Sequence, residues 1–265
     1  MAESKDAGEI LKSVVEDGHD ELGRASVGLA FSGFAGGLNI SFSAVAVASA
    51  GAITGGIGLA AMALYPLGFI IVILGRAQLF TENTVTPVAV ALTEPRQIPN
   101  MLRLWVLVLV FNLLGALVFA AAVTYGEVLS PKALGLLLDE VAHKLGYGFG
   151  TTLMKGVFGG WLVALIAWLV AASRDTVSQI LFIWVLTFLI PVGGLTHCIA
   201  GSSEVLMSAF ADKTSWIEYF GSFLLPTTLG NIIGGVFLVA LLNYGQVVGS
   251  RMRTSLAKHT DPYNQ

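Results

Sequence analysis

One stretch of the sequence, from Ala25 to Gly75, contains no charged residue. A helix needs about 20 apolar residues to cross a lipid bilayer, so this stretch can hold two crossings and a turn. The glycines at positions 51, 55, 56 and 58 mark that turn. Hydrophobic residues make up 55% of the chain, charged residues make up 12%, and the mean hydropathy is +0.79. These values place the chain among integral membrane proteins.

The rest of the sequence alternates between apolar stretches and polar connections. We expect six membrane-spanning helices, at about residues 27–50, 57–79, 104–125, 152–172, 176–211 and 219–244. They form an all-α channel domain over residues 25–250. Apolar residues at helical spacing predict an amphipathic N-terminal helix within residues 1–24. Residues 251–265 form a polar C-terminal tail.

Six crossings put both termini on the same side of the membrane. Nine Lys and Arg residues fall in the tails and connections of that side, and four fall on the opposite side. The nine are Lys5, Lys12, Arg24, Arg96, Arg103, Arg174, Arg251, Arg253 and Lys258, and the four are Lys132, Lys144, Lys155 and Lys213. Because basic residues are retained in the cytoplasm, we expect both termini to be cytoplasmic, in a bacterial inner membrane.

Two of the six spans are interrupted at membrane depth. The fifth contains Pro191 and Gly194 near its middle, and the second contains Arg76 and Glu82 before it becomes apolar again. Lipid offers no water to backbone groups that a break sets free, so a broken helix must line a cavity inside the protein. His197 lies at the second break, and an ionisable residue at that depth indicates a functional site. The alternative is a histidine that only packs between helices.

The two halves of the chain resemble one another. The matches are Asn112-Leu-Leu-Gly-Ala with Asn231-Ile-Ile-Gly-Gly, 119 residues later; Leu79-Phe80-Thr81-Glu82 with Cys198-Ile199-Ala200-Gly201 at the same shift; and Gly36-Gly37 with Gly159-Gly160 at a slightly different offset. Each half has three spans, an odd number, so the second half enters from the opposite side. The sequence predicts an inverted repeat, with halves at about 25–125 and 150–245 and a midplane binding site where the two broken helices meet.

Three motifs resemble those of the formate/nitrite transporter family. They are Ala77-Gln78-Leu79-Phe80-Thr81, Thr196-His197-Cys198-Ile199-Ala200, and Leu225-Pro226-Thr227-Thr228-Leu229-Gly230-Asn231-Ile232-Ile233-Gly234-Gly235. The resemblance covers essentially the whole chain. It implies aquaporin-like protomers in a homopentamer, each with its own pore. It also implies that the solute is a small monovalent anion or its conjugate acid.

The same resemblance implies roles for individual residues. His197 is expected to be the central histidine, and Thr81 the threonine beside it. Tyr65, Phe69 and Phe80 are expected to form the constriction on the cytoplasmic side. The other implied positions are Ile190 at the opposite constriction, Thr196 in the pore beside the histidine, and Lys144 and Arg24 in the two vestibules.

Several positions depart from the family pattern and resemble its divergent YfdC-like branch. The family usually has Gly at Arg76, an acid at Gln78, Gly or Ser at Glu82, Asn at Gly160 and Gly201, and, in formate members, an acid at Thr196. His197 therefore has fewer polar neighbours and two carboxylates nearby in sequence, those of Glu82 and Glu204. Glu204 is expected to cap or pair near the start of the second half-helix.

The departures leave two questions open. Glu82 either forms an ion pair with Arg76 across the break or faces the pore unpaired. The function expected is a channel or transporter for small monovalent weak-acid anions that is proton-linked through the central histidine, with the proton supplied through His197 or water. The alternatives are a pore for an uncharged small solute and a non-conducting sensor or scaffold. An enzyme is disfavoured because no zinc-protease, nucleophile-elbow or phosphate-loop motif occurs. No cofactor, metal or nucleic-acid partner is expected. The partners expected are membrane lipid, the solute and further copies of the chain.

Overall fold

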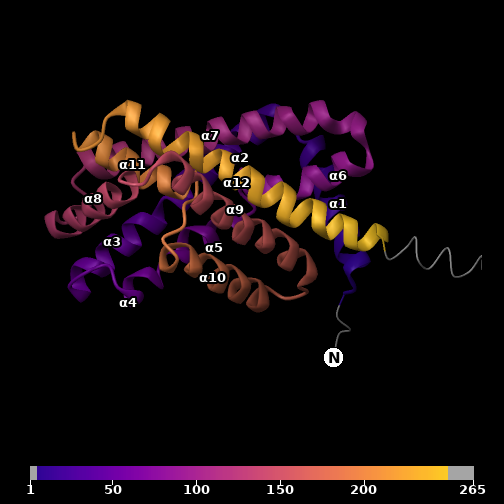
Figure 1. Cartoon of the computed structure of the whole chain (residues 1–265), viewed down its shortest axis with the longest axis horizontal. Coiled ribbons are helices and arrows are strands. Elements are labelled where there is room, and N and C mark those ends of the chain that lie inside the picture. The colour runs from indigo at the N-terminus through magenta and orange to yellow at the C-terminus, as the bar shows by residue number, and fades with distance from the viewer. Residues whose placement is uncertain (1–4, 250–265) are drawn as a thin grey trace, which may run out of the picture.

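The computed structural model describes residues 5–249, which form an all-helical bundle (Figure 1). Residues 1–4 of the predicted N-terminal helix and the whole predicted tail at 251–265 lie outside the described residues. Four helices are long and apolar enough to cross a membrane, namely Ser26–Thr54, Pro95–Tyr125, Phe149–Ala172 and Glu218–Gly249. Two shorter apolar helices, Leu59–Leu74 and Thr176–Val192, are each followed by a break and a further short helix. The predicted six spans, with the second and fifth broken, are therefore confirmed.

The first half of the chain contains spans one to three. Its helices are α2 (Ser26–Ile40), α3 (Phe42–Thr54), α4 (Leu59–Met62), α5 (Pro66–Leu74), α6 (Thr86–Thr93) and α7 (Ile98–Tyr125), with 3₁₀ turns at Glu82–Thr84 and Pro95–Gln97. The first span consists of α2 and α3, which are separated only by Ser41, whose hydroxyl donates to the Gly37 carbonyl at 2.7 Å. The broken second span consists of α4, α5 and, beyond the break, the half-helix α6.

The second half repeats this plan with the opposite orientation. Its helices are α9 (Phe149–Ala172), α10 (Thr176–Val192), α11 (Ala200–Phe210) and α12 (Leu225–Gly235), with π-helical segments at Glu218–Leu224 and Val236–Leu241. Pro191 lies at the end of α10, and Gly194, with a φ of 57°, turns the chain out of the helix. The half-helices α6 and α11 lie at opposite ends of the molecule (Figure 1), as an inverted repeat requires.

A buried asparagine ties together the three spans of the first half. The side-chain carbonyl of Asn112, on α7, accepts a hydrogen bond from the backbone N–H of Phe80 at 2.9 Å. Its Nδ2 donates to the backbone carbonyls of Gly33 at 2.7 Å and Gln78 at 2.9 Å. Asn112 thus satisfies backbone groups that the break in the second span leaves without helical partners.

Asn231 does the same in the second half. Its Oδ1 accepts from the N–H of Cys198 at 2.9 Å, and its Nδ2 donates to the carbonyls of Gly156 at 2.7 Å and Thr196 at 3.1 Å. The partners show that Cys198 corresponds to Phe80, not to Leu79. The 119-residue overlay therefore misplaces the break by one position, because the second half has one more residue between its break and its asparagine.

Glycines let the spans of each half approach closely. A Cβ on Gly37 would collide with the backbone of Asn112, and a Cβ on Gly160 with the backbone of Asn231. In the same way, a Cβ on Gly36 would collide with the carbonyl of Gln78 at the first break, and a Cβ on Gly159 with the carbonyl of Thr196 at the second. The structure uses these small residues for close helix contacts inside one protomer.

The N-terminal amphipathic helix packs over the end of the bundle that holds α6 (Figure 1). This helix, α1 (Ala7–Gly23), begins with a capping box in which Asp6 accepts from the backbone N–H of Glu9 at 2.8 Å and the Glu9 carboxylate accepts from that of Asp6 at 2.9 Å. The hydroxyl of Thr86, the first residue of α6, donates to the Glu21 carboxylate at 2.6 Å. Helix α1 is therefore fixed to the half-helix of the second span.

The connection between the third and fourth spans contains a further helix, α8 (Pro131–Leu145). The sequence predicts only a polar connection here. Ala133, Leu137 and Val141 are buried at four-residue spacing and pack α8 against α3 and α11. Ser130 caps the helix by accepting from the N–H of Ala133 at 3.2 Å. Helices α1 and α8 thus cover opposite ends of the molecule (Figure 1).

Candidate transport pathway

His197 lies where the breaks of the two halves meet. Its ring is buried, with 1% of the residue exposed, just before the first turn of α11. Nε2 lies 2.7 Å from the hydroxyl of Thr81, which belongs to the break of the other half. The predicted pairing of the central histidine with Thr81 agrees with this contact. The contact joins two residues that are far apart in sequence but occupy the two breaks.

The backbone of α11 determines which nitrogen of His197 carries the proton. Nδ1 accepts hydrogen bonds from the N–H groups of Ile199 at 3.3 Å and Ala200 at 3.1 Å. A nitrogen that accepts two N–H groups cannot carry a hydrogen of its own without repelling them. The neutral ring therefore holds its hydrogen on Nε2, and this N–H donates to the Thr81 oxygen. The Thr81 hydroxyl hydrogen is left to donate to another group.

Aromatic rings connect His197 to one end of the molecule. The Phe69 ring meets the imidazole edge to face at a centroid distance of 5.1 Å, and Tyr65 follows at 5.5 Å from Phe69. Tyr65 and Ile190 then line the same cavity as Lys144. The prediction that Tyr65 lies at the constriction on the side of the termini is therefore wrong. Tyr65 lies near the start of the second span, between α4 and α5, and this part of the span is at the end of the molecule that α8 covers.

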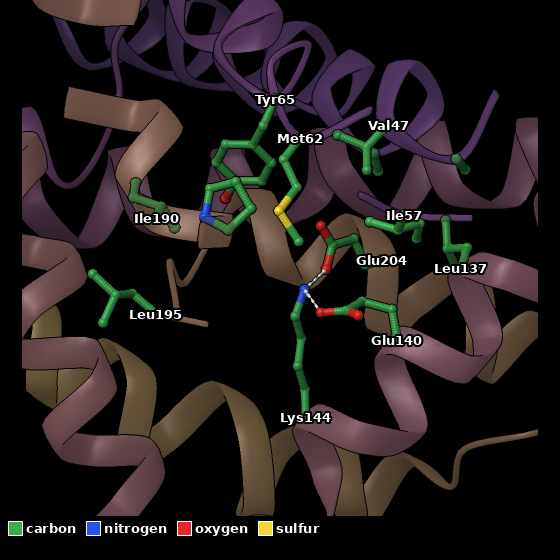
Figure 2. Close-up of a pocket in the computed structure, with 13 residues that line it drawn as sticks. Val47, Ile57, Met62, Tyr65, Leu137, Glu140, Lys144, Ile190, Leu195 and Glu204 are labelled. Carbon is green, nitrogen blue, oxygen red and sulfur yellow. Dashed lines mark hydrogen bonds and ion pairs between the residues drawn. The ribbon is translucent and has the colours of Figure 1, made fainter. Parts of the chain in front are cut away.

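We call this space the lysine cavity, and its volume is about 40 Å³. Its lining includes Tyr65, Ile190, Lys144, Glu140 and Glu204. Figure 2 shows Lys144 extending from α8 toward Glu204 of α11, with Tyr65 and Met62 nearby. The Nζ of Lys144 lies 2.6 Å from Oε2 of Glu204 and 3.6 Å from Oε1 of Glu140. The prediction that Glu204 pairs is confirmed, and its partner is the expected vestibule lysine.

The carboxylates keep Lys144 charged. Burial lowers the pKa of the Lys144 ammonium, but the neighbouring Glu204 and Glu140 carboxylates outweigh burial and raise the pKa above its usual value. Sequence reasoning did not single out Glu140. Its spacing of four residues from Lys144 on one helix is the signal that could have identified it.

A second space, the terminal cavity, opens beside α1 and has a volume of about 480 Å³. Its polar lining is Asp17, Asp20, Glu21, Arg24, Arg76, Gln78, Glu82, Thr86, Thr176 and Gln179. Arg24 lines this cavity, and its vestibule role stays a prediction. Burial raises the pKa of Glu21 to about 7. The two cavities lie on either side of the His197–Thr81 pair, because one is lined by α8 and the other by α1.

Comparison with known proteins agrees with this arrangement. The formate/nitrite transporter family matches the chain over residues 8–245. The chain belongs to the formate/nitrite transporter family. It is 32% identical over 244 residues to the inner membrane protein YfdC of Escherichia coli (strain K12), a match covering 90% of this chain and 78% of the relative. It is also 32% identical over 224 residues to a probable formate transporter of Methanothermobacter thermautotrophicus, covering 78% and 81%.

Solved structures share the fold of this formate/nitrite transporter family member. An FNT family ion channel superimposes with a TM-score of 0.78 at 19% identity, covering 88% of this chain and 97% of the other. A pentameric formate channel with formate bound gives a TM-score of 0.73 at 18% identity, covering 84% and 98%. At these identities the likeness establishes the fold alone, and the fold is the predicted one.

The structure shows the surroundings of Arg76 and Glu82, two positions at which this chain departs from the usual family residues. Arg76 has a φ of 56°, a left-handed conformation that favours the glycine usual in the family. In the described part of the chain, Arg76 and Glu82 line the terminal cavity without forming an ion pair with one another. The structure therefore does not form the ion pair of the first alternative, and both side chains line the same cavity.

Other predicted pore residues serve the packing of the breaks. Phe80 is buried and meets Trp105 edge to face at 5.8 Å, and it lines neither of the two cavities described above. The Thr196 hydroxyl donates to the Thr152 carbonyl at 3.4 Å, toward α9. A Cβ on Gly201 would collide with the Phe223 ring, which occupies the space beside it. Among residues 5–249, no three His, Cys, Asp or Glu side chains are grouped as a metal site requires.

Proposed function

We propose that this family member passes a small monovalent weak acid, of the formate or nitrite kind, across the membrane. The observation that carries the proposal is the buried His197–Thr81 pair, which lies between two cavities on opposite sides of the molecule. The pair presents a neutral hydrogen-bonding site inside an otherwise apolar passage formed by Phe69 and Tyr65. Relatives described as a probable formate transporter and as formate channels support the same class of solute.

The solute crosses the narrow part as its conjugate acid. Transferring an unpaired charge into an apolar interior costs several kcal/mol or more, and a neutral imidazole cannot compensate for that cost. Binding a proton from water in a cavity removes the charge before the solute reaches Phe69. The geometry of His197 favours water as the proton source, because its Nδ1 is occupied by two backbone N–H groups.

A flux panel in proteoliposomes tests the proposal. Wild-type protein is expected to pass formate and nitrite, with faster flux as the external pH falls, because more of each solute is then protonated. Acetate, lactate, hydrosulfide and glycerol define the size and charge limits, and liposomes without protein give the background. Flux of glycerol alone, indifferent to pH, would overturn the weak-acid proposal. The absence of flux for every solute would favour a sensor or scaffold.

The terminal cavity gives one reason to keep an uncharged solute as a second candidate. Glu82 lines this cavity without an ion pair to Arg76, and an ionised carboxylate there repels anions. At a pH at which Glu82 is ionised, Glu82→Gln is therefore expected to raise formate flux about fivefold if weak-acid transport is correct, since one charge near the path is removed. The same substitution would leave the flux of an uncharged solute unchanged.

We also propose that the protein is a homopentamer. A structural neighbour is described as a pentameric formate channel, and this chain exposes many large apolar side chains on its spans. Light scattering corrected for detergent is expected to give a protein mass of about five times the 27.8 kDa of one chain. A stable monomer or tetramer would contradict the pentamer.

Both termini are proposed to lie in the cytoplasm of a bacterial cell. The nine-to-four distribution of Lys and Arg supports this orientation, and it puts the terminal cavity on the cytoplasmic side. A reporter that requires the cytoplasm, fused after Gln265, is expected to be active. Activity only of a reporter that requires the periplasm would reverse the orientation.

A further inference from the structure

The charges of the lysine cavity do not add up to an attractive site for an anion. Three charged side chains line it, one ammonium and two carboxylates. Glu204 is 2.6 Å from Lys144, and their side chains are only 10% and 15% exposed. Glu140 is 3.6 Å from Lys144, with its side chain 38% exposed. The three groups together carry one negative charge when all are ionised.

The short pair dominates the field inside this cavity. Charges that are shielded from water interact more strongly than exposed ones, so Glu204 neutralises Lys144 more completely than Glu140 does. An anion arriving in the cavity meets an ammonium whose charge is already balanced at close range. To bind Lys144 directly, the anion would have to displace a buried carboxylate, which would then be left without its partner.

The position of Glu204 places the Lys144–Glu204 pair between the lysine cavity and His197. It lies on α11, whose first turn binds Nδ1 of His197, and it shares the cavity with Tyr65 and Ile190. Figure 2 shows the carboxylate facing the end of the Lys144 side chain, in the space below Tyr65 and Met62. A solute that moves from this cavity toward His197 therefore passes the Lys144–Glu204 pair first.

We propose that Glu204 is a specificity-determining residue that excludes the free anion from the lysine cavity. It does so by neutralising Lys144, and the undissociated acid is then the species that enters from this side. This inference rests on the proposed passage of weak acids and adds the form in which they are accepted. It predicts that most formate crosses without net charge movement in the wild-type protein, with only a small formate current.

The test compares formate current with electroneutral formate uptake at a single fixed pH of about 7, in bilayers and proteoliposomes of the full chain. Glu204→Gln keeps the shape and a hydrogen-bond acceptor for Lys144 but removes the charge. The ratio of current to uptake is expected to rise about fivefold, as a unit charge about 4 Å from an anion changes its local concentration. Glu140→Gln is expected to raise the ratio by a smaller factor, because the Glu140 carboxylate lies farther from the Lys144 ammonium than the Glu204 carboxylate does and is more exposed.

Two controls separate charge from structure. Lys144→Gln combined with Glu204→Gln returns the three positions to the wild-type sum of one negative charge and is expected to return the ratio to the wild-type value. Asp139→Asn removes the same charge from an exposed position on α8 and is expected to leave the ratio unchanged. Thermal unfolding in detergent reports whether each variant is folded.

The outcomes distinguish this inference from the proposed function. If the wild-type protein shows neither formate uptake nor current, the proposed function is wrong. If wild-type uptake is present but folded Glu204→Gln leaves the ratio unchanged, the inference alone is wrong. If Glu204→Gln does not fold, Glu140→Gln decides, and an unchanged ratio in that variant also contradicts the inference.

Discussion

Replacing Asn231 by leucine is expected to prevent the second half of the protein from forming its break. The asparagine side chain satisfies three buried backbone groups, those of Cys198, Gly156 and Thr196. Leaving a buried backbone group unsatisfied costs about 1–3 kcal/mol, and three such losses amount to several kcal/mol. In lipid no water can replace the missing partner. We expect little folded protein, measured as the oligomer fraction in size exclusion and as the unfolding temperature in detergent.

The repeat supplies a matched variant for this experiment. Asn112→Leu removes the equivalent three hydrogen bonds in the first half and is expected to be as damaging. Asn243→Leu makes the same substitution on the helix of Asn231, at a half-buried position, and is expected to be mild. Equal unfolding temperatures for Asn231→Leu and Asn243→Leu would refute the bridging role of the asparagine.

The features of the fold that the sequence predicts are those with local causes. The number of spans follows from the lengths of the apolar stretches. The break in the fifth span follows from Pro191, which lacks an N–H group, and from Gly194, which adopts a left-handed conformation. The repeat is visible because Asn112 and Asn231 have the same backbone groups to satisfy. Local chemistry therefore specifies the architecture without any knowledge of long-range contacts.

The parts of the site that the sequence does not predict depend on contacts between distant segments. The lysine cavity is lined by Tyr65, Lys144 and Glu204, which come from three separate segments that only the tertiary fold brings together. The Lys144–Glu204 pair joins two elements, and only the packing of α8 on α11 brings its members together. The apolar residues of α8 occur at helical spacing in the sequence, but this segment was predicted only as a polar connection.

Replacing His197 by phenylalanine is expected to lower formate flux five- to 150-fold while the protein remains a folded oligomer. Phenylalanine fills the space beside Phe69 but offers no N–H, so the Thr81 hydroxyl loses its partner and the solute loses the imidazole donor. A buried polar group without its partner costs about 1–3 kcal/mol, which corresponds to a five- to 150-fold loss of rate for a solute that depends on it. His143→Phe places the same ring at an exposed position of α8 and is expected to leave flux unchanged.

The pH dependence of the remaining flux identifies what the histidine does. His197 is held with Nδ1 accepting from the N–H groups of Ile199 and Ala200, so it acts as a neutral donor through Nε2 and not as a proton carrier. Thr81→Val removes the acceptor of that donor and is expected to lower formate flux about tenfold, within the same range for a lost buried hydrogen bond. The residual flux should still rise as pH falls, because the fraction of protonated solute sets that dependence. If Thr81→Val or His197→Ala abolished the pH dependence but not the flux, the proton would come from His197 and not, as we propose, from water. If His197→Ala and His197→Phe both left flux and its pH dependence unchanged, the passage would not run through this histidine.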